Sequence, residues 1–228
     1  MTAFCDLNRS PNPATATQDV LMTNPTALHE LESYWASLPR RNGVPMRKDV
    51  DPAAMAGLLE DSFILERVAP GVARIRVAGR NFGRLIGVEP RGLPLTAAFL
   101  TDARAEMSKH LEAAFMSPAI VELALEAPRA VGQPHLQGKI LLLPLRDDHG
   151  RVSRMLGVLV MSGLRGLGGR RFIVSAKTPA RVEPVLGLHT VATGAAPVAV
   201  APQRPSLAPQ PNKKAEDKPA LRLVVSNP

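Results

Sequence analysis

The sequence predicts an α+β domain in which a five-stranded antiparallel sheet is interrupted by a helical crossover and preceded by N-terminal helices. Two observations predict this architecture. Two stretches carry apolar residues at helical spacing, one near the start of the chain and one in its middle, and five others show alternating or continuous apolar runs bounded by turn residues. Along the chain, these patterns follow the order two helices, two strands, a mainly helical connection and three strands.

The first helix is expected to begin at Pro25, with Asn24 as its N-cap, and to end before Pro39. Asp51 and Pro52 form a second start signal, for a short helix. The first helix carries an apolar stripe, which serves either docking onto the sheet or dimerisation. This stripe consists of Leu28, Leu31, Trp35 and Leu38.

The first two strands, Phe63–Val68 and Val72–Val77, form a hairpin with Pro70 and Gly71 in its turn. Glycines then limit the next stretch to short helices and turns, and a longer helix follows, capped by Thr101 or Asp102. The alternating and apolar patterns then resume. They predict three strands, at residues 121–126, 138–145 and 152–162, with Asp147–Gly150 as a turn between the last two.

Composition divides the 228 residues into three regions. Residues 1–23 are polar, and residues 187–228 are dominated by Ala, Pro, Gln and Lys. Neither region buries enough apolar surface to offset the entropy lost on ordering, so we expect a disordered leader and a disordered tail around a folded domain at 24–186. The tail ends in a short β-prone segment, which is expected to dock on a partner or on its own domain. Its apolar residues are Leu221, Leu223, Val224 and Val225.

The net charge of +8 makes contact with acidic partners electrostatically easy. The arginines are spread along the chain without a dense basic helix, so a nucleic-acid-associated regulatory protein is the alternative function and not the leading one. Cys5 is the only cysteine, which excludes a disulfide framework or a multi-cysteine metal site within one chain. Neither a secretory signal nor a run of about 20 apolar residues is present, so we expect a cytoplasmic protein without membrane insertion.

Two segments of the chain resemble a bacterial family of small stand-alone PAS-like proteins. Leu38-Pro39-Arg40-Arg41 is similar to the L-P-x-R opening of that family, and residues 47–52 are similar to its R-x-D-x-D-P motif. Arg76-Val77-Ala78-Gly79 resembles the family's second strand and the start of its glycine-rich connection. The motif residues Arg47, Asp49, Asp51 and Pro52 are expected to act mainly in structure, with Asp51 as a helix cap and Arg47 paired with Asp49 or another carboxylate.

The PAS resemblance implies a sensory or scaffolding role, because PAS domains bind small ligands or protein partners. We therefore expect a non-enzymatic regulatory module that acts by ligand binding or by contact with a signalling partner or a second copy. A candidate pocket for a small apolar ligand lies between the sheet and the crossover helices, although the same residues would also form a solid core. The helical side of this pocket is expected from Phe82, Leu85, Ile86, Leu111 and Phe115, and its sheet side from Ile75, Val77, Leu141 or Leu142, and Val158 or Leu159.

No cofactor, metal site or catalytic set is expected. Gly79-Arg80-Asn81-Phe82 resembles the G-R-N-C segment of flavin-binding light sensors, but Phe82 replaces the cysteine that forms the flavin adduct. His110 lies on the crossover helix, where haem-binding PAS domains carry an axial histidine, but at the flank of its apolar face. The other histidines are scattered without the spacing of metal ligands.

Overall fold

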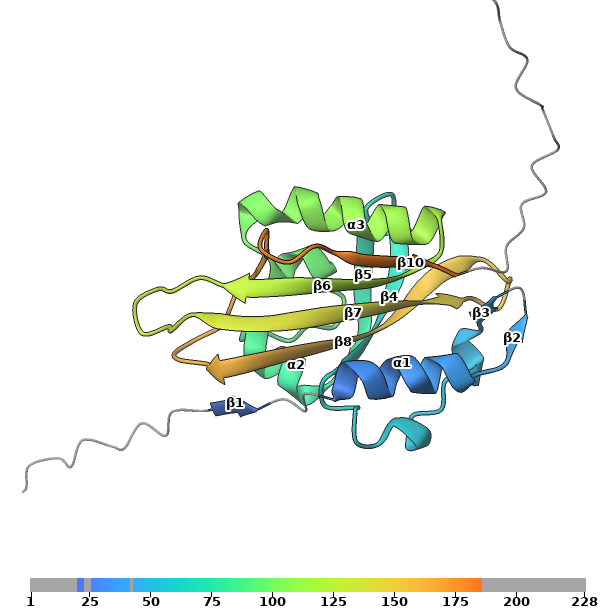
Figure 1. Ribbon diagram of the computed structural model, residues 1–228, viewed down its shortest axis with the longest axis horizontal. Coiled ribbons are helices and arrows are strands. Elements are labelled where there is room, and N and C mark those ends of the chain that lie inside the picture. Colours follow the sequence, from blue (N-terminus) through green and yellow to red (C-terminus); the bar gives the residue numbers. More distant parts are fainter. Residues whose placement is uncertain (1–19, 23–25, 42, 186–228) are drawn as a thin grey trace, which may run out of the picture. The chain divides into compact units, whose positions relative to one another are not determined.

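The computed structural model describes residues 20–22, 26–41 and 43–185 (Figure 1). The helices are α1 (Ala27–Ser37), α2 (Arg80–Ile86) and α3 (Arg104–Met116), and 3-10 turns lie at Arg47–Asp49, Ala53–Met55, Leu95–Ala98 and Thr101–Ala103. The strands are β1 (Val20–Met22), β2 (Arg40–Arg41), β3 (Val44–Pro45), β4 (Ser62–Ala69), β5 (Val72–Ala78), β6 (Ala119–Ala127), β7 (Leu136–Arg146), β8 (Val152–Leu164), β9 (Ile173–Val174) and β10 (Arg181–Pro184).

The five strands expected from the sequence, β4 to β8, form one antiparallel sheet in the order β6-β7-β8-β4-β5. The first strand of the hairpin, β4, pairs directly with the last strand, β8, with Ile64 opposite Leu156. The connection between β5 and β6 contains α2, two 3-10 turns and α3. The predicted fold class, an antiparallel sheet with one helical crossover and a leading helix, is therefore confirmed.

Three short strands extend this sheet and were not expected. Strands β9 and β10 pair with β6 and cover its outer edge. Strand β1 pairs with the end of β8, where Val20 lies opposite Leu164. Val158 is the last residue of β8 that pairs with β4. Beyond it, the backbone N–H and C=O groups on that edge of β8 can pair with another strand. Part of the expected leader is thus a strand, while residues 1–19 and the expected tail from 187 onward lie outside the described residues.

Two helix boundaries differ from the expectation. The first helix begins at Ala27 with Thr26 as its N-cap residue, while Asn24 and Pro25 lie outside the described residues. The crossover helix begins at Arg104, and neither Thr101 nor Asp102 caps it with a side chain, because both belong to a preceding 3-10 turn. Its end at Met116, before Pro118, agrees with the expectation.

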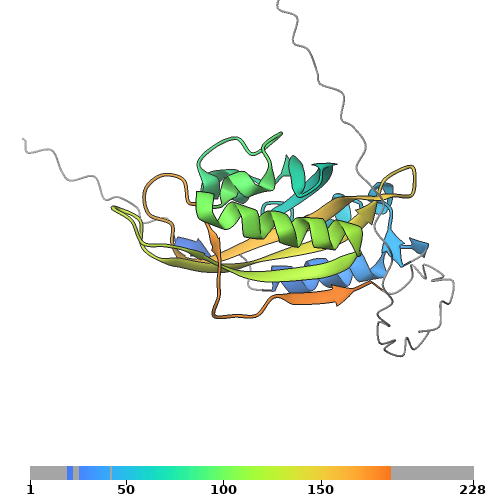
Figure 2. The ribbon, with the colours of Figure 1, turned by 90° about the horizontal axis from the view of Figure 1, so that it is seen from above.

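Helices cover both faces of the sheet (Figure 2). We call the face that packs against α2 and α3 the inner face, and the face that packs against α1 the outer face. Each face has its own apolar core, because alternate residues of a strand point to opposite sides. Leu142 and Leu159 belong to the inner core, whereas their neighbours Leu141 and Val158 belong to the outer core.

A β-bulge interrupts this alternation in the first hairpin. Ile64 pairs with Val77, but the next residue, Leu65, pairs with Ile75, so Arg76 is the extra residue. Ile75 points into the inner core and is 1% exposed. Val77 is 55% exposed and shares the outer face with Ile64. The bulge therefore moves Val77 to the opposite side of the sheet from the one that its spacing predicts.

Candidate functional site

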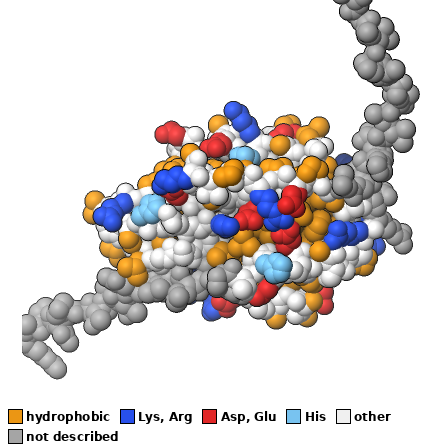
Figure 3. Space-filling view, in the orientation of Figure 1, with side chains coloured by type: hydrophobic (Ala, Val, Ile, Leu, Met, Phe, Trp, Pro, Cys, Tyr) orange, Lys and Arg blue, Asp and Glu red, His pale blue; other side chains and the backbone are white. Residues whose placement is uncertain are grey.

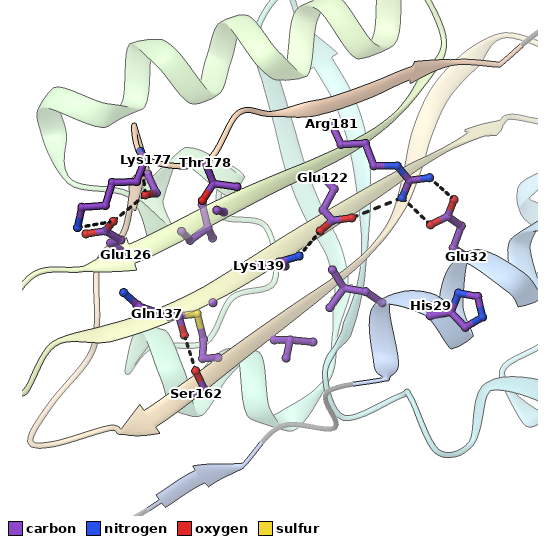
Figure 4. Close-up of a pocket in the computed structure, with 17 residues that line it drawn as sticks. His29, Glu32, Glu122, Glu126, Gln137, Lys139, Ser162, Lys177, Thr178 and Arg181 are labelled. Carbon is purple, nitrogen blue, oxygen red and sulfur yellow. Dashed lines mark hydrogen bonds and ion pairs between the residues drawn. The ribbon is translucent and has the colours of Figure 1, made fainter.

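One candidate site is an open groove of about 650 Å³ on the outer face, which α1 covers only in part (Figure 4). Outward residues of β6, β7 and β8 form its floor, including Glu122, Ala124, Lys139 and Val160. One wall is the start of α1, and the other is the segment from β9 to β10. The remaining lining residues are Leu28, His29, Glu32, Leu125, Glu126, Gln137, Gly138, Met161, Ser162, Ser175, Lys177, Thr178 and Arg181.

Arg181 on β10 connects the two walls of this groove. Its guanidinium donates two hydrogen bonds to the Glu32 carboxylate on α1, at 2.7 and 2.8 Å, and lies 3.4 Å from a Glu122 oxygen. These bidentate contacts raise the pKa of Arg181 above its ordinary value, with the Glu32 carboxylate as the main cause and Glu183 as the next. Arg181 thus fixes β10 against α1 across the edge of the sheet.

Each lysine and arginine that lines the groove lies beside a carboxylate. Lys139 Nζ lies 2.7 Å from Glu122, and Lys177 Nζ lies 3.3 Å from Glu126. A 2.6 Å hydrogen bond from Ser175, with further contributions from His135 and Lys177, lowers the pKa of Glu126 to about 2. On this face red and blue side chains lie next to one another, so the groove is polar but electrically balanced (Figure 3).

The candidate pocket on the inner face is occupied by protein side chains. Eight of its predicted residues belong to one apolar core and are at most 5% exposed. The rings of Phe63 and Phe82 lie 5.2 Å apart, so Phe82 is a core residue. This packing favours the solid-core interpretation. The eight residues are Ile75, Phe82, Leu85, Ile86, Leu111, Phe115, Leu142 and Leu159.

The other three predicted pocket residues are not brought to this site. Leu141 and Val158 point into the outer core, so of the two alternatives at each position the structure selects Leu142 and Leu159 for the inner face. Val77 also lies on the outer face, because of the bulge at Arg76. The expectation that Val77 lies beside Ile75 on the sheet side of the inner pocket is wrong.

The apolar stripe of α1 docks onto the sheet of its own chain. Leu31 and Trp35 are buried in the outer core, and Leu28 and Leu38 pack against it in part. The indole Nε1 of Trp35 donates a 2.9 Å hydrogen bond to the carbonyl of Pro144 on β7. Between docking and dimerisation, the buried part of the stripe serves docking, and only Leu28 also lines the groove.

The family motif lies beside a second, smaller pocket of about 380 Å³ on the outer face. Arg47 and Pro52 line this pocket. The Asp51 carboxylate accepts a 2.9 Å hydrogen bond from the Ala53 amide, as expected of a cap. Within the described part of the chain, the Arg47 side chain makes no hydrogen bond or ion pair with Asp49 or any other residue, so the expected ion pair is not formed.

The remaining candidates are the turn at Asp147, a metal site, His110 and the C-terminal segment. Asp147 lies in the expected turn, where its carboxylate accepts hydrogen bonds from the amides of His149 and Arg151. Among the described residues, no group of three His, Cys, Asp or Glu side chains is arranged to hold a metal ion. His110 is half-buried on α3, and the apolar residues Leu221 to Val225 lie outside the described range. Within residues 26–41 and 43–185, no helix is long and apolar enough to cross a membrane.

Sequence reasoning missed the groove itself. The alternation of Glu122 and Glu126 with apolar residues indicated a polar strand face, but nothing in the sequence placed Glu32 or Arg181 beside it. These two residues are 149 positions apart in the chain. Their contact depends on the pairing of β10 with β6, and a four-residue strand within a polar segment has no distinct periodic signal.

Two solved structures are similar to part of this chain. The chain is similar to two light-oxygen-voltage structures, titled "Flavin Analogue Sheds Light on Light-Oxygen-Voltage Domain Mechanism" and "Structure of an RNA-binding Light-Oxygen-Voltage Receptor". The identities are 21% and 20% and the TM-scores 0.35 and 0.34, over 49% and 54% of this chain. The matches span 83% of the first structure's chain and 37% of the second's. No curated protein matches.

The family comparison covers most of the described residues. A family model described as PAS domain matches residues 22–160, from the end of β1 through most of β8. The match includes all five strands of the central sheet and the whole crossover. By its sequence, its strand order and its helical crossover, this chain belongs to the PAS domain family.

Proposed function

We propose that this PAS domain is a non-enzymatic regulatory module that acts by protein contact, with a second copy of the chain bound at the groove on its outer face. PAS domains are generally sensory or regulatory and not catalytic. The observation that carries the proposal is the contrast between a filled inner face and an open outer groove. A module whose inner face is filled by its own side chains transmits a signal through its surface.

The charge pattern of the groove suits a second copy. Three basic side chains, Lys139, Lys177 and Arg181, stand among three acidic ones, Glu32, Glu122 and Glu126. A two-fold interface brings the same patch of both subunits together, so it needs a self-complementary surface, which balanced charges provide. The same balance gives no support to nucleic acid at this face, because each of these cations already lies beside a carboxylate.

The test is the oligomeric state of the full chain, measured by sedimentation velocity over a wide range of concentrations. We expect a dimer that Ala124→Arg weakens at least tenfold, because Ala124 lies on the groove floor, where a long cation would obstruct the partner. Val131→Arg serves as the matched control, since Val131 is fully exposed in the loop between β6 and β7. A chain that stays monomeric at high concentration, or a dimer unaffected by Ala124→Arg, refutes the proposal.

A further inference from the structure

The pocket beside the family motif, which we call the bulge pocket, is apolar and partly open. It lies between the 47–60 segment and the outer face of β4 and β5, and its volume of about 380 Å³ is within the range of small-molecule sites. The exposed side chains of Leu59 and Val77 line it. The other lining residues are Arg47, Val50, Pro52, Met55, Glu60, Ser62, Phe63, Ile64, Ala78, Gly79, Arg80 and Leu156.

The bulge at Arg76 creates this apolar surface. Without the extra residue, Val77 would follow Ile75 into the inner core. With it, Val77 lies on the outer face opposite Ile64 and leaves more than half of its side chain exposed. Bulges bend the strand and often re-aim a side chain beside a functional site. Exposing a valine to water has an energetic cost, which a bound apolar group would offset.

The charges around the bulge pocket are not balanced. Arg80 forms a 2.5 Å ion pair with Glu60, so these two lining charges neutralise each other. Arg47 is half-buried, and its guanidinium has neither a hydrogen-bond partner nor an ion-pair partner among the described residues. A guanidinium with five free donors in a fork geometry matches a carboxylate in two parallel hydrogen bonds. The pocket therefore combines apolar walls with one uncompensated positive charge.

We infer that the bulge pocket binds a small amphipathic carboxylate, with its carboxylate on Arg47 and its acyl chain against Val77 and Leu59. The apolar walls favour the acyl chain of the ligand, and the free guanidinium favours an anionic head group over a neutral or cationic one. None of the residues that line this pocket also lines the groove, so this inference and the proposed dimer are tested separately.

The inference is tested by calorimetric titration of the full chain with decanoate, decanol and decylamine. We expect saturable one-to-one binding of decanoate, weaker binding of decanol and weaker still of decylamine. Affinity should rise up to about fourfold with each methylene added from hexanoate to decanoate, since each buried methylene contributes a similar free energy. The inference is overturned if decanoate binding does not saturate. It is also overturned if decanol binds as tightly as decanoate, because the surface would then be only an apolar contact.

Two substitutions locate the site. Arg47→Gln should weaken decanoate binding about tenfold to a hundredfold, the range expected for hydrogen bonds to a charged group, and leave decanol unaffected. Arg91→Gln, at an exposed arginine outside the pocket, controls for the loss of one positive charge. Decanoate binding that is equal in the two variants overturns the assignment to Arg47.

Val77→Asp should abolish decanoate binding, because it places a carboxylate where the acyl chain is expected. Val68→Asp is its matched control, since Val68 is an exposed valine on the same hairpin and does not line the pocket. Both variants alter exposed positions, and melting curves followed by circular dichroism verify that they are folded. Undiminished decanoate binding to a folded Val77→Asp variant contradicts the proposed position of the ligand.

Discussion

The two faces of the sheet are built from the same strands but differ in composition. The inner face is a continuous apolar core of aliphatic and aromatic side chains under α2 and α3. The outer face has a smaller core under α1 and, beside it, a groove of paired charges and an apolar pocket with one unpaired arginine. A single helix of 11 residues cannot cover a sheet of this width, so part of the outer face stays open. The inner face supplies stability, and the outer face is available for binding.

The largest expected effect lies on the inner face. Phe82→Ala should destabilise the domain by about 3–5 kcal/mol, because it removes a buried ring that packs against Phe63 and leaves a cavity. Urea unfolding followed by circular dichroism measures this change. A loss below about 1 kcal/mol would indicate that the inner face already encloses an empty chamber, and the contrast between the faces would fail.

A pair of substitutions on one strand tests the bulge. Ile75→Ala should cost about 2–5 kcal/mol, since Ile75 is buried in the inner core. Val77→Ala should change stability by no more than about 0.5 kcal/mol, because Val77 lies exposed on the outer face. The same urea experiment measures both. Similar losses at the two positions would mean that both residues point into one core and that Arg76 forms no bulge.

The smallest expected effect concerns the electrostatics of the groove. Glu126→Gln should lower the melting temperature at neutral pH, because Glu126 holds Ser175 and Lys177 against β6. The pKa of Glu126 is lowered from 4.5 to about 2, so its stabilising contribution is present above pH 4.5 and is lost as the pH falls towards 2. The difference in melting temperature between wild type and variant should therefore shrink over that interval.

Glu106→Gln provides the comparison for this titration, since Glu106 is exposed on α3 and does not line the groove. It should leave the melting temperature nearly unchanged at every pH. A gap between wild type and Glu126→Gln that stays constant from neutral to acid pH would show that Glu126 contributes through its shape and not through its charge.

One further contact could not be predicted from local patterns. Arg170, which the sequence offered only as one of many scattered arginines, is 1% exposed. Its guanidinium donates hydrogen bonds to the carbonyls of Ala127 at the end of β6, of Pro128 and Pro134 in the β6–β7 connection, and of Arg165. Its burial lowers its pKa by desolvation. The fold decides whether an arginine is exposed to solvent or is buried and hydrogen-bonded to the loops around it.

By itself, the sequence determined the fold class, the five central strands, the crossover and the amphipathic first helix, because these depend on local periodicity and on turn residues. The tertiary structure alone decided which side of the sheet each strand residue faces. A single bulge at Arg76 reverses the side that Val77 faces, and only pairing distinguishes Leu141 from Leu142. The contact of Glu32 with Arg181 likewise needs an edge strand too short to show a period. Local spacing thus specifies the elements, while long-range pairing specifies the surface on which binding takes place.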